Sequence, residues 1–370
     1  MINRIIRKGN PDKPHIAFTF DDGPYRRPLD DWLDPLEKWG GRGTFFFTGE
    51  WLDKHTELAR EIIYRGHEIA PHTYHHRRIG EISKEVFWEE MQMAELAYQE
   101  ATGLACPTFF RSPYNHYRDE NLEWFKELGY YNIRGDISDD WSGISSKQII
   151  NNVQPALQNG TIVVFHANDI AKGTPGAIDP LLEFAYQKKL VSVRVSDILK
   201  DINIRFSHRF WKVSIDVPTT EIDDTLMDWQ PIENDEALRQ LATQTMDWGI
   251  PHIPKGDKSK EHWLQYLSQP ISINEVKEDR KLFVGWRMID HYWGYVRAGV
   301  HGDELLLMDF ATREAQADAL IYLLRWAAKT AKELGCSKIS TTKDLRRLHK
   351  MAQQLGWKSS IELDDSLIST

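Results

Sequence analysis

The chain has 370 residues, of which 41% are hydrophobic and 27% charged, with a formal net charge of −9 and two cysteines. This length suits about two domains, and the composition is that of an ordinary soluble globular protein. Without a long run of one charge sign, the negative charge argues against a nucleic-acid-binding surface, and no apolar run reaches the roughly 18–20 residues of a membrane span.

Cysteine usage and the N-terminal residues predict the cellular compartment. Cys106 and Cys336 lie far apart, so a disulfide framework is not expected. Residues 1–13 are short, mixed and polar, without the apolar core and small-residue cleavage site of a secretory signal. We therefore expect a cytoplasmic location.

Strand-like and helix-like segments alternate through the first half of the chain. Apolar runs predict strands at 16–20, 44–48, 68–71, 108–111, 130–134, 161–165 and 191–195. Helical spacing, with glycines as stop signals, predicts helices at 29–39, 52–65, 84–102, 121–128, 147–158 and 180–188. This alternation predicts parallel strands joined by crossover helices, in a sheet or a barrel, with chemistry at the C-terminal ends of the strands.

The regular alternation of strands and helices ends at about Arg205, and we place a domain boundary near 204–218. We expect strands at 210–216, 282–289, 293–298, 305–310 and 338–341. We expect helices at 235–248, 260–267, 314–334 and 345–355. The predicted domains are residues 1–204 and 205–370.

Two adjacent carboxylates end the first long strand, in the sequence FTFDDGP at 18–24. Like charges on neighbouring residues repel unless a cation lies between them or one is protonated. A bound metal would satisfy both acids, with one as a ligand and the other free as a base. The alternative is an Asx-type turn that caps the following helix.

Two histidines four residues apart follow the strand at 68–71, in the sequence HTYHH at 72–76. On one helical turn, this spacing would place His72 and His76 on the same face. Two neutral imidazoles and one carboxylate make three ligands and leave a position for water, as in catalytic zinc sites. The alternative is a solvated polar loop that contains these histidines by chance.

Three more polar clusters follow predicted strands. The sequence RSPY at 111–114 offers an arginine that could pair with a free aspartate and fix its orientation. The sequence DISDDW at 136–141 places three acids before a tryptophan, and the strand at 161–165 runs directly into His166. Five polar clusters, each at the end of a strand, are hard to attribute to chance.

Together the motifs TFDDGP, HTxxH, RxPY, DW and an apolar strand ending in His are similar to the five motifs of the polysaccharide deacetylase family. This is the NodB-homology fold, carbohydrate esterase family 4. The resemblance covers about residues 12–200 in the family's order. It implies an irregular (β/α) barrel and a hydrolase that removes an N-acetyl group from an amino sugar.

The resemblance implies a metal centre. Asp22, His72 and His76 would hold one divalent metal ion, zinc by preference, with cobalt, nickel or manganese as alternatives. Such an ion polarises an amide carbonyl and lowers the pKa of bound water.

The resemblance also gives roles to six further residues. These roles are general base (Asp21), its positioning cation (Arg111), general acid (His166), the acid's partner (Asp140), oxyanion donor through a backbone N–H (Tyr114) and groove lining (Trp141). The family usually has an acid where this chain has Ile137. Which of Asp136, Asp139 and Asp140 orients His166 therefore stays open.

The substrate implied is a saccharide bearing N-acetyl groups. A cytoplasmic chain fits a soluble sugar intermediate, nucleotide-linked or lipid-linked, better than a cell-wall glycan. Two alternatives remain: hydrolysis of a non-sugar amide such as a ureide or acyl-polyamine, and a catalytically weak carbohydrate-binding protein.

The second half resembles the C-terminal part of the GNAT acyltransferase fold in its order of strands and helices. In that family a Gly-rich loop after the fourth strand cradles the pyrophosphate of acetyl-CoA. Here 311–318 reads ATREAQAD, without glycine, and Glu314 and Asp318 would repel phosphate. We therefore expect a smaller α+β GNAT-like domain that serves substrate recognition or homodimer formation. An active transferase and another α/β fold are the alternatives.

Overall fold

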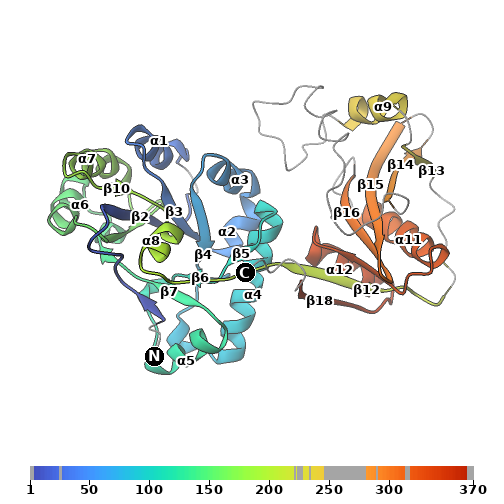
Figure 1. Cartoon of the computed structure of the whole chain (residues 1–370), viewed down its shortest axis with the longest axis horizontal. Coiled ribbons are helices and arrows are strands. Elements are labelled where there is room, and N and C mark those ends of the chain that lie inside the picture. Colours follow the sequence, from blue (N-terminus) through green and yellow to red (C-terminus); the bar gives the residue numbers. More distant parts are fainter. Residues whose placement is uncertain are drawn as a thin grey trace. The chain divides into compact units, whose positions relative to one another are not determined.

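The structure, a computed structural model, describes residues 4–24, 27–220, 222, 228–232, 235–245, 281–288, 291–312 and 317–364. The chain forms two compact units, which divide between Phe210 and Trp211 (Figure 1). Each unit is an α/β structure with its own sheets and core, so each is described by itself.

The first unit alternates strands and helices, as the sequence predicts. Its strands are β1 (Ile5–Ile6), β2 (His15–Asp22), β3 (Gly43–Phe47), β4 (Glu68–Pro71), β5 (Cys106–Pro107), β6 (Phe109–Phe110), β7 (Tyr131–Ile133), β8 (Asp136–Ile137), β9 (Ile162–His166), β10 (Val191–Ser192) and β11 (His208–Arg209). Its α-helices are α1 (Asp30–Lys38), α2 (Gly49–Lys54), α3 (Thr56–Tyr64), α4 (Lys84–Thr102), α5 (Asp119–Glu127), α6 (Ser146–Val153), α7 (Thr174–Gln187) and α8 (Val195–Asp201).

Parallel pairing organises nine of these strands into a six-stranded and a three-stranded sheet, and β5 and β11 form a separate antiparallel pair. The larger sheet has the order β4-β3-β2-β9-β8, with β10 added beside β2, and the smaller has the order β1-β7-β6. Every pair in both sheets is parallel. The strands of the expected barrel therefore belong to two separate sheets. The hydrogen bonds between the described strands do not join these sheets into one closed barrel.

Aromatic residues on β2, β3 and β9 fill the core of this unit. Phe18 and Phe20 on β2 pack against Phe165 on β9, and Phe20 stacks on Phe45 of β3 at 4.9 Å between ring centroids. All four rings are fully buried. Helices lie around the strands in Figure 1 and cover this core. The apolar strands are thus held in register up to their polar C-terminal ends.

Two expected helices differ from the structure. The segment 52–65 forms two helices, because His55 leaves the helical region (φ −132°) and its ring stacks on Trp51 instead. Helix α7 begins at Thr174, six residues before the expected start, since Pro175 fits the first turn of a helix. The strand expected at 191–195 shortens to β10, and α8 begins at Val195.

The second unit has one mixed sheet of seven described strands. The elements are β12 (Trp211–Asp216), β13 (Asp228–Pro231), α9 (Asp235–Thr245), β14 (Lys281–Met288), β15 (His291–His301), β16 (Glu304–Thr312), α11 (Ala317–Glu333), β17 (Lys338–Thr341), α12 (Leu345–Gln354) and β18 (Ser359–Leu363). The strand order is β13-β14-β15-β16-β17-β12-β18. Only β16 and β17 pair in parallel among these, and β12 lies between β17 and β18, antiparallel to both.

Several predictions for this half fall partly or wholly outside the described residues. The helix at 260–267 lies wholly outside them. The other such segments are partly described and lack residues 246–248 of the helix at 235–248, residue 289 of the strand at 282–289, residues 314–316 of the helix at 314–334 and residues 313–316 of the glycine-free junction at 311–318. Across the described part of the chain, we find no helix with the length and apolar character needed to span a membrane.

Candidate active site

Strand register brings the predicted polar residues to one edge of the large sheet. Asp21 on β2 is the register partner of His166 on β9. Asp22 is the partner of Phe47 on β3, which in turn is the partner of Pro71, the last residue of β4. Because these strands are parallel, their C-terminal ends deliver the two acids, His166 and the segment after Pro71 to the same place.

Asp22, His72 and His76 converge at this edge, as the sequence predicts. The Nε2 atom of His76 lies 3.2 Å from Oδ1 of Asp22 and 3.2 Å from Nε2 of His72. Nε2 of His72 lies 3.5 Å from the same Oδ1. Tetrahedral ligands about 2.0–2.1 Å from a zinc ion lie about 3.3–3.4 Å from one another. The donor atoms therefore have the spacing of three corners of a zinc tetrahedron, and the cluster is a possible metal site.

Neighbouring groups fix which atoms these ligands present. Nδ1 of His72 donates to the carbonyl oxygen of Arg111 at 2.9 Å, so in the neutral ring Nε2 keeps its lone pair. Nδ2 of Asn168 donates to Oδ2 of Asp22 at 2.6 Å, which leaves Oδ1 for the two imidazoles. Burial would raise the pKa of Asp22, but His72 and His76 hold that pKa well below its usual value.

The histidines converge through a loop, and the expected helical turn is wrong. The segment 72–78 contains neither helix nor strand, and Thr73 and His76 have φ values of 61° and 59°. Left-handed backbone at both residues breaks any helix that would start at His72. The two imidazoles therefore meet because the loop doubles back.

Asp21 pairs with Arg111 beside this cluster. Nη1 of Arg111 donates to Oδ1 of Asp21 at 2.6 Å and to the hydroxyl of Thr19 at 2.8 Å. Nε donates to the carbonyl of Ile133, and the guanidinium lies 4.1 Å from the ring centroid of Phe46. Both members of the ion pair are buried, and burial lowers the pKa of Arg111. Oδ2 of Asp21 lies 4.0 Å from Nε2 of His72, so a free carboxylate oxygen borders the candidate metal site.

Asp140 is the acid that contacts His166. One carboxylate oxygen lies 2.7 Å from Nδ1 of His166, and the other accepts from the backbone N–H of His166 at 2.7 Å and from the hydroxyl of Thr174 at 2.6 Å. Asp140 is fully buried, whereas Asp139 is exposed. Burial would lower the pKa of His166, but the hydrogen bond to Asp140 and the nearby charge of Asp21 raise it to about 9.

The two predicted substrate-binding residues are exposed. Tyr114 lies in the left-handed region (φ 56°), and its ring is 4.5 Å from the ring of His76 and 4.3 Å from the guanidinium carbon of Arg78. Trp141 directly follows Asp140 in a short 3₁₀ turn. The side chains of Tyr114 and Trp141 are 58% and 57% exposed, respectively, which is unusual for large rings.

Three residues of the site were missed by the sequence analysis. Thr19 supports the Asp21–Arg111 pair, Asn168 holds Asp22, and Thr174 holds Asp140. Thr19 lies inside the first motif, where its polar side chain within an apolar strand was a usable signal. Asn168 lies in a loop and Thr174 is the first residue of α7, and the sequence carries no local signal at either position.

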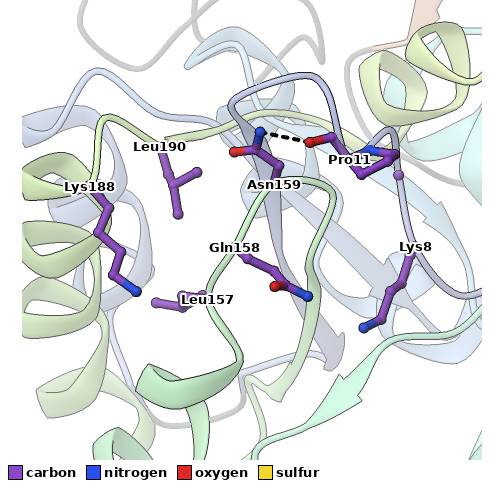
Figure 2. A pocket seen from close by; sticks show the side chains of 8 residues that line it. Lys8, Pro11, Leu157, Gln158, Asn159, Lys188 and Leu190 are labelled. Carbon is purple, nitrogen blue, oxygen red and sulfur yellow. Dashed lines mark hydrogen bonds between the residues drawn. The ribbon is translucent and has the colours of Figure 1, made fainter.

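A separate pocket of about 680 Å³ does not involve any of these residues. It is lined by residues before β2, before β9 and before β10, at the N-terminal ends of these strands. Figure 2 shows Lys8, Gln158 and Lys188 around it, and Asn159 donating a hydrogen bond to the carbonyl of Pro11. Since the acids and histidines lie at the opposite strand ends, this pocket is not the candidate active site.

Fold and site together define the first unit as a parallel α/β domain with a possible Asp/His metal centre at the C-terminal edge of its sheet. Comparison with known families agrees with this class. Residues 8–133 match the family model "Polysaccharide deacetylase". Residues 8–133 of the chain are therefore similar to polysaccharide deacetylases.

Two curated relatives have deacetylase names, which denote hydrolases of amide C–N bonds. A peptidoglycan-N-acetylglucosamine deacetylase of Bacillus cereus is 28% identical over 187 residues, covering 50% of this chain and 67% of the relative. A chitooligosaccharide deacetylase of Bradyrhizobium is 29% identical over 152 residues, covering 41% of this chain and 69% of the relative. The match spans 51% and 32% of two further relatives, so it does not extend over their whole length.

A solved structure shows the same fold. The crystal structure of a peptidoglycan N-acetylglucosamine deacetylase superposes with a TM-score of 0.51 at 25% sequence identity. The matched region covers 53% of this chain and 92% of the chain in the crystal structure. The likeness therefore concerns about half of the present chain.

Proposed function

We propose that the first unit is a metal-dependent hydrolase that removes an N-acetyl group from an amino sugar within a saccharide. The convergence of Asp22, His72 and His76 beside the free oxygen of Asp21 is the observation that carries this proposal. The deacetylase names of the relatives support the reaction.

Zinc is the metal that we propose for the cluster. Two imidazole nitrogens and one carboxylate oxygen are a donor set typical of catalytic zinc sites, and their spacing fits a tetrahedron. Cobalt, nickel and manganese are alternatives that accept the same ligand types. A divalent ion held there would polarise the amide carbonyl and lower the pKa of a water molecule.

Asp21 acts as the general base in this proposal. Its Oδ1 is bound to Arg111, so the carboxylate keeps one orientation, and its Oδ2 borders the cluster and is available to take a proton. A buried arginine that contacts Asp21, Thr19 and a backbone carbonyl has little freedom to move. The base is therefore positioned before the substrate arrives.

His166 acts as the general acid. An amine is a poor leaving group unless it is protonated, so the acid must carry a proton when the C–N bond breaks. With a pKa of about 9, His166 holds that proton at neutral pH. Nδ1 is held by Asp140, so Nε2 is the nitrogen from which the proton leaves.

Tyr114 and Trp141 belong to the substrate side of this proposal. The left-handed backbone of Tyr114 beside His76 suits its proposed task, in which its N–H donates to the oxygen of the tetrahedral intermediate. Trp141 offers an exposed ring next to Asp140 for stacking on a sugar.

The remaining parts of the proposal concern substrate, location and the second unit. We propose a nucleotide-linked, lipid-linked or soluble saccharide made in the cytoplasm, and no nucleic-acid partner, given the net charge of −9. The mixed sheet of the second unit, residues 205–370 in our division, is proposed as a GNAT-like module for substrate recognition or homodimer formation. Gel filtration of the whole chain tests the dimer.

Metal analysis combined with an acetate-release assay tests the function. We expect about one divalent ion per chain, and acetate release from N-acetylated nucleotide-sugars, lipid-linked sugars or oligosaccharides. Asp22→Ala should lose both the ion and the activity, because it removes one of three ligands. The exposed Asp139→Ala is the matched control and should retain both.

Three outcomes would contradict the proposal. The first is an Asp22→Ala variant that keeps its metal and its turnover. The second is a metal-loaded wild-type protein that hydrolyses ureides or acyl-polyamines but no acetylated sugar, which would favour the non-sugar alternative. The third is binding of sugars without turnover in any metal, which would indicate a carbohydrate-binding protein.

A further inference from the structure

Glu90, on α4, is a buried carboxylate at the base of the loop that carries His72 and His76. It is 3% exposed. One oxygen accepts from the backbone N–H groups of Tyr74 and His75, at 3.2 and 2.8 Å. The other lies 2.7 Å from Nδ1 of His75 and 3.1 Å from Nε of Arg77. All four donors come from residues 74–77, between or next to the two histidine ligands.

This loop needs a fixing group from outside itself. Because Thr73 and His76 are left-handed, the loop has no helical hydrogen bonds to hold the two imidazoles at a fixed separation. Its other side is held by α2, where the N–H groups of Gly49 and Glu50 donate to the carbonyls of Thr73 and Tyr74. Backbone carbonyls are thus bound by α2, and backbone N–H groups by Glu90.

We propose that Glu90 is a positioning residue for the metal centre. Its carboxylate holds the backbone of residues 74 and 75 so that Nε2 of His72 and Nε2 of His76 stay 3.2 Å apart and face Asp22. Glu90 itself does not touch the cluster. The inference rests on the metal-binding part of the proposed function.

The charge of Glu90 is what the four donors require. An ionised carboxylate is acceptor-only and can receive all four bonds, whereas the amide of glutamine offers one acceptor oxygen and a second group that only donates. In Glu90→Gln, the amide NH₂ would face either the two backbone N–H groups or the His75 and Arg77 donors. Buried donors would then lose their acceptor, and the loop would shift to regain one.

Metal affinity is the quantity to measure. The dissociation constants of zinc and cobalt for the full chain are obtained by competition with a chromophoric chelator, at a temperature where the metal-free protein is folded. Groups that support metal ligands typically contribute about 10–100-fold in affinity, and we expect a loss in this range for Glu90→Gln. Glu89→Gln, on the exposed neighbouring position of α4, removes the same charge and should leave the affinity unchanged.

Thermal unfolding of the metal-free proteins separates positioning from general stability. If Glu90→Gln lowers the unfolding temperature but binds zinc like the wild type, the proposal is wrong. If Glu90→Gln does not fold, His75→Ala tests the same point, because the exposed side chain of His75 supplies one of the four contacts and its backbone N–H, which supplies another, is kept. We expect His75→Ala to weaken zinc binding severalfold, and unchanged binding would overturn the proposal. A wild-type chain that binds no metal would instead overturn the proposed function.

Discussion

Asp140 holds His166 at two points, since its carboxylate binds both Nδ1 of the ring and the backbone N–H, each at 2.7 Å. A single acid thus fixes the orientation of the imidazole relative to its own backbone. The same carboxylate, together with the nearby charge of Asp21, raises the pKa of the ring. Asp140 therefore contributes to both the orientation and the protonation of the proposed acid.

Asp140→Asn should reduce acetate release by about 10²–10⁴-fold, the usual contribution of a general acid. The shape of the pH profile should change as well. In the wild type, His166 is protonated below about pH 9, so activity should fall as pH rises through 9. Without the Asp140 charge, burial lowers the pKa of His166 and the alkaline limb moves to lower pH. Asp139→Asn is the control, and an unmoved limb in Asp140→Asn would refute the assignment.

Asn168→Ala should weaken zinc binding by about 10–100-fold. The substitution removes the amide that holds Oδ2 of Asp22 at 2.6 Å, so the carboxylate can rotate away from the two imidazoles. Chelator competition measures the change. Asn159→Ala, which loses a hydrogen bond to Pro11 near the separate pocket, is the matched control. Equal affinities of the two variants would mean that Asn168 does not position Asp22.

Because of His67, the fold should become less stable as the pH falls into the mildly acidic range. Its ring is buried, Nδ1 accepts from the backbone N–H of Gly43 at 3.1 Å, and burial lowers its pKa to about 4 despite the nearby Glu37. The unfolded chain, with a pKa of about 6.5, takes up this proton first as pH falls. Stability contributed by the neutral ring is therefore present above pH 6.5 and is lost between 6.5 and 4, by about 1.4 kcal/mol per pH unit.

The comparison with His67→Gln isolates this contribution. Glutamine can accept from Gly43 but does not titrate, so the variant should lose less stability between pH 6.5 and 5 than the wild type. Urea unfolding at several pH values gives the free energies. Parallel pH dependence in the two proteins would show that His67 is not the group responsible.

Gly49→Ala should destabilise the fold by about 1–3 kcal/mol. A Cβ at Gly49 would lie 2.2 Å from Cδ2 of Tyr74, in the loop that carries His72 and His76, so the ring or the loop must move. Thermal unfolding measures the loss. In a Tyr74→Ala background the clash is absent, and the same substitution should cost much less. Equal costs in both backgrounds would contradict this explanation.

The proximity of Asp22, His166 and His72 was predictable because it follows from parallel pairing. Asp22 and His166 end two strands of one sheet, and His72 follows a third, so their proximity needed only the strand assignments. The family resemblance named Asp140 as the partner of His166, but the residues themselves did not distinguish it from Asp139. A left-handed residue at 139 (φ 63°) leaves one acid exposed and the next buried, and adjacent aspartates give no pattern that distinguishes them.

The two histidines were paired correctly, but the geometry was wrong for a physical reason. Spacing of four residues suggested a helix, which is a local structure. The actual loop is held by Glu90 and by α2, groups that are distant in sequence and obey no local periodicity. Asn168 and Thr174 were missed for the same reason, because each donates a hydrogen bond to an aspartate that is distant in sequence.

The strand order of the second unit has a consequence for how the chain is made. Strand β12 is the first of that unit to leave the ribosome, yet its two neighbours, β17 and β18, are the last. During synthesis β12 therefore stays unpaired on one edge until β17 emerges and on the other until β18 emerges. Until then, these two edges could pair with another extended segment, of the same chain or of a neighbouring one.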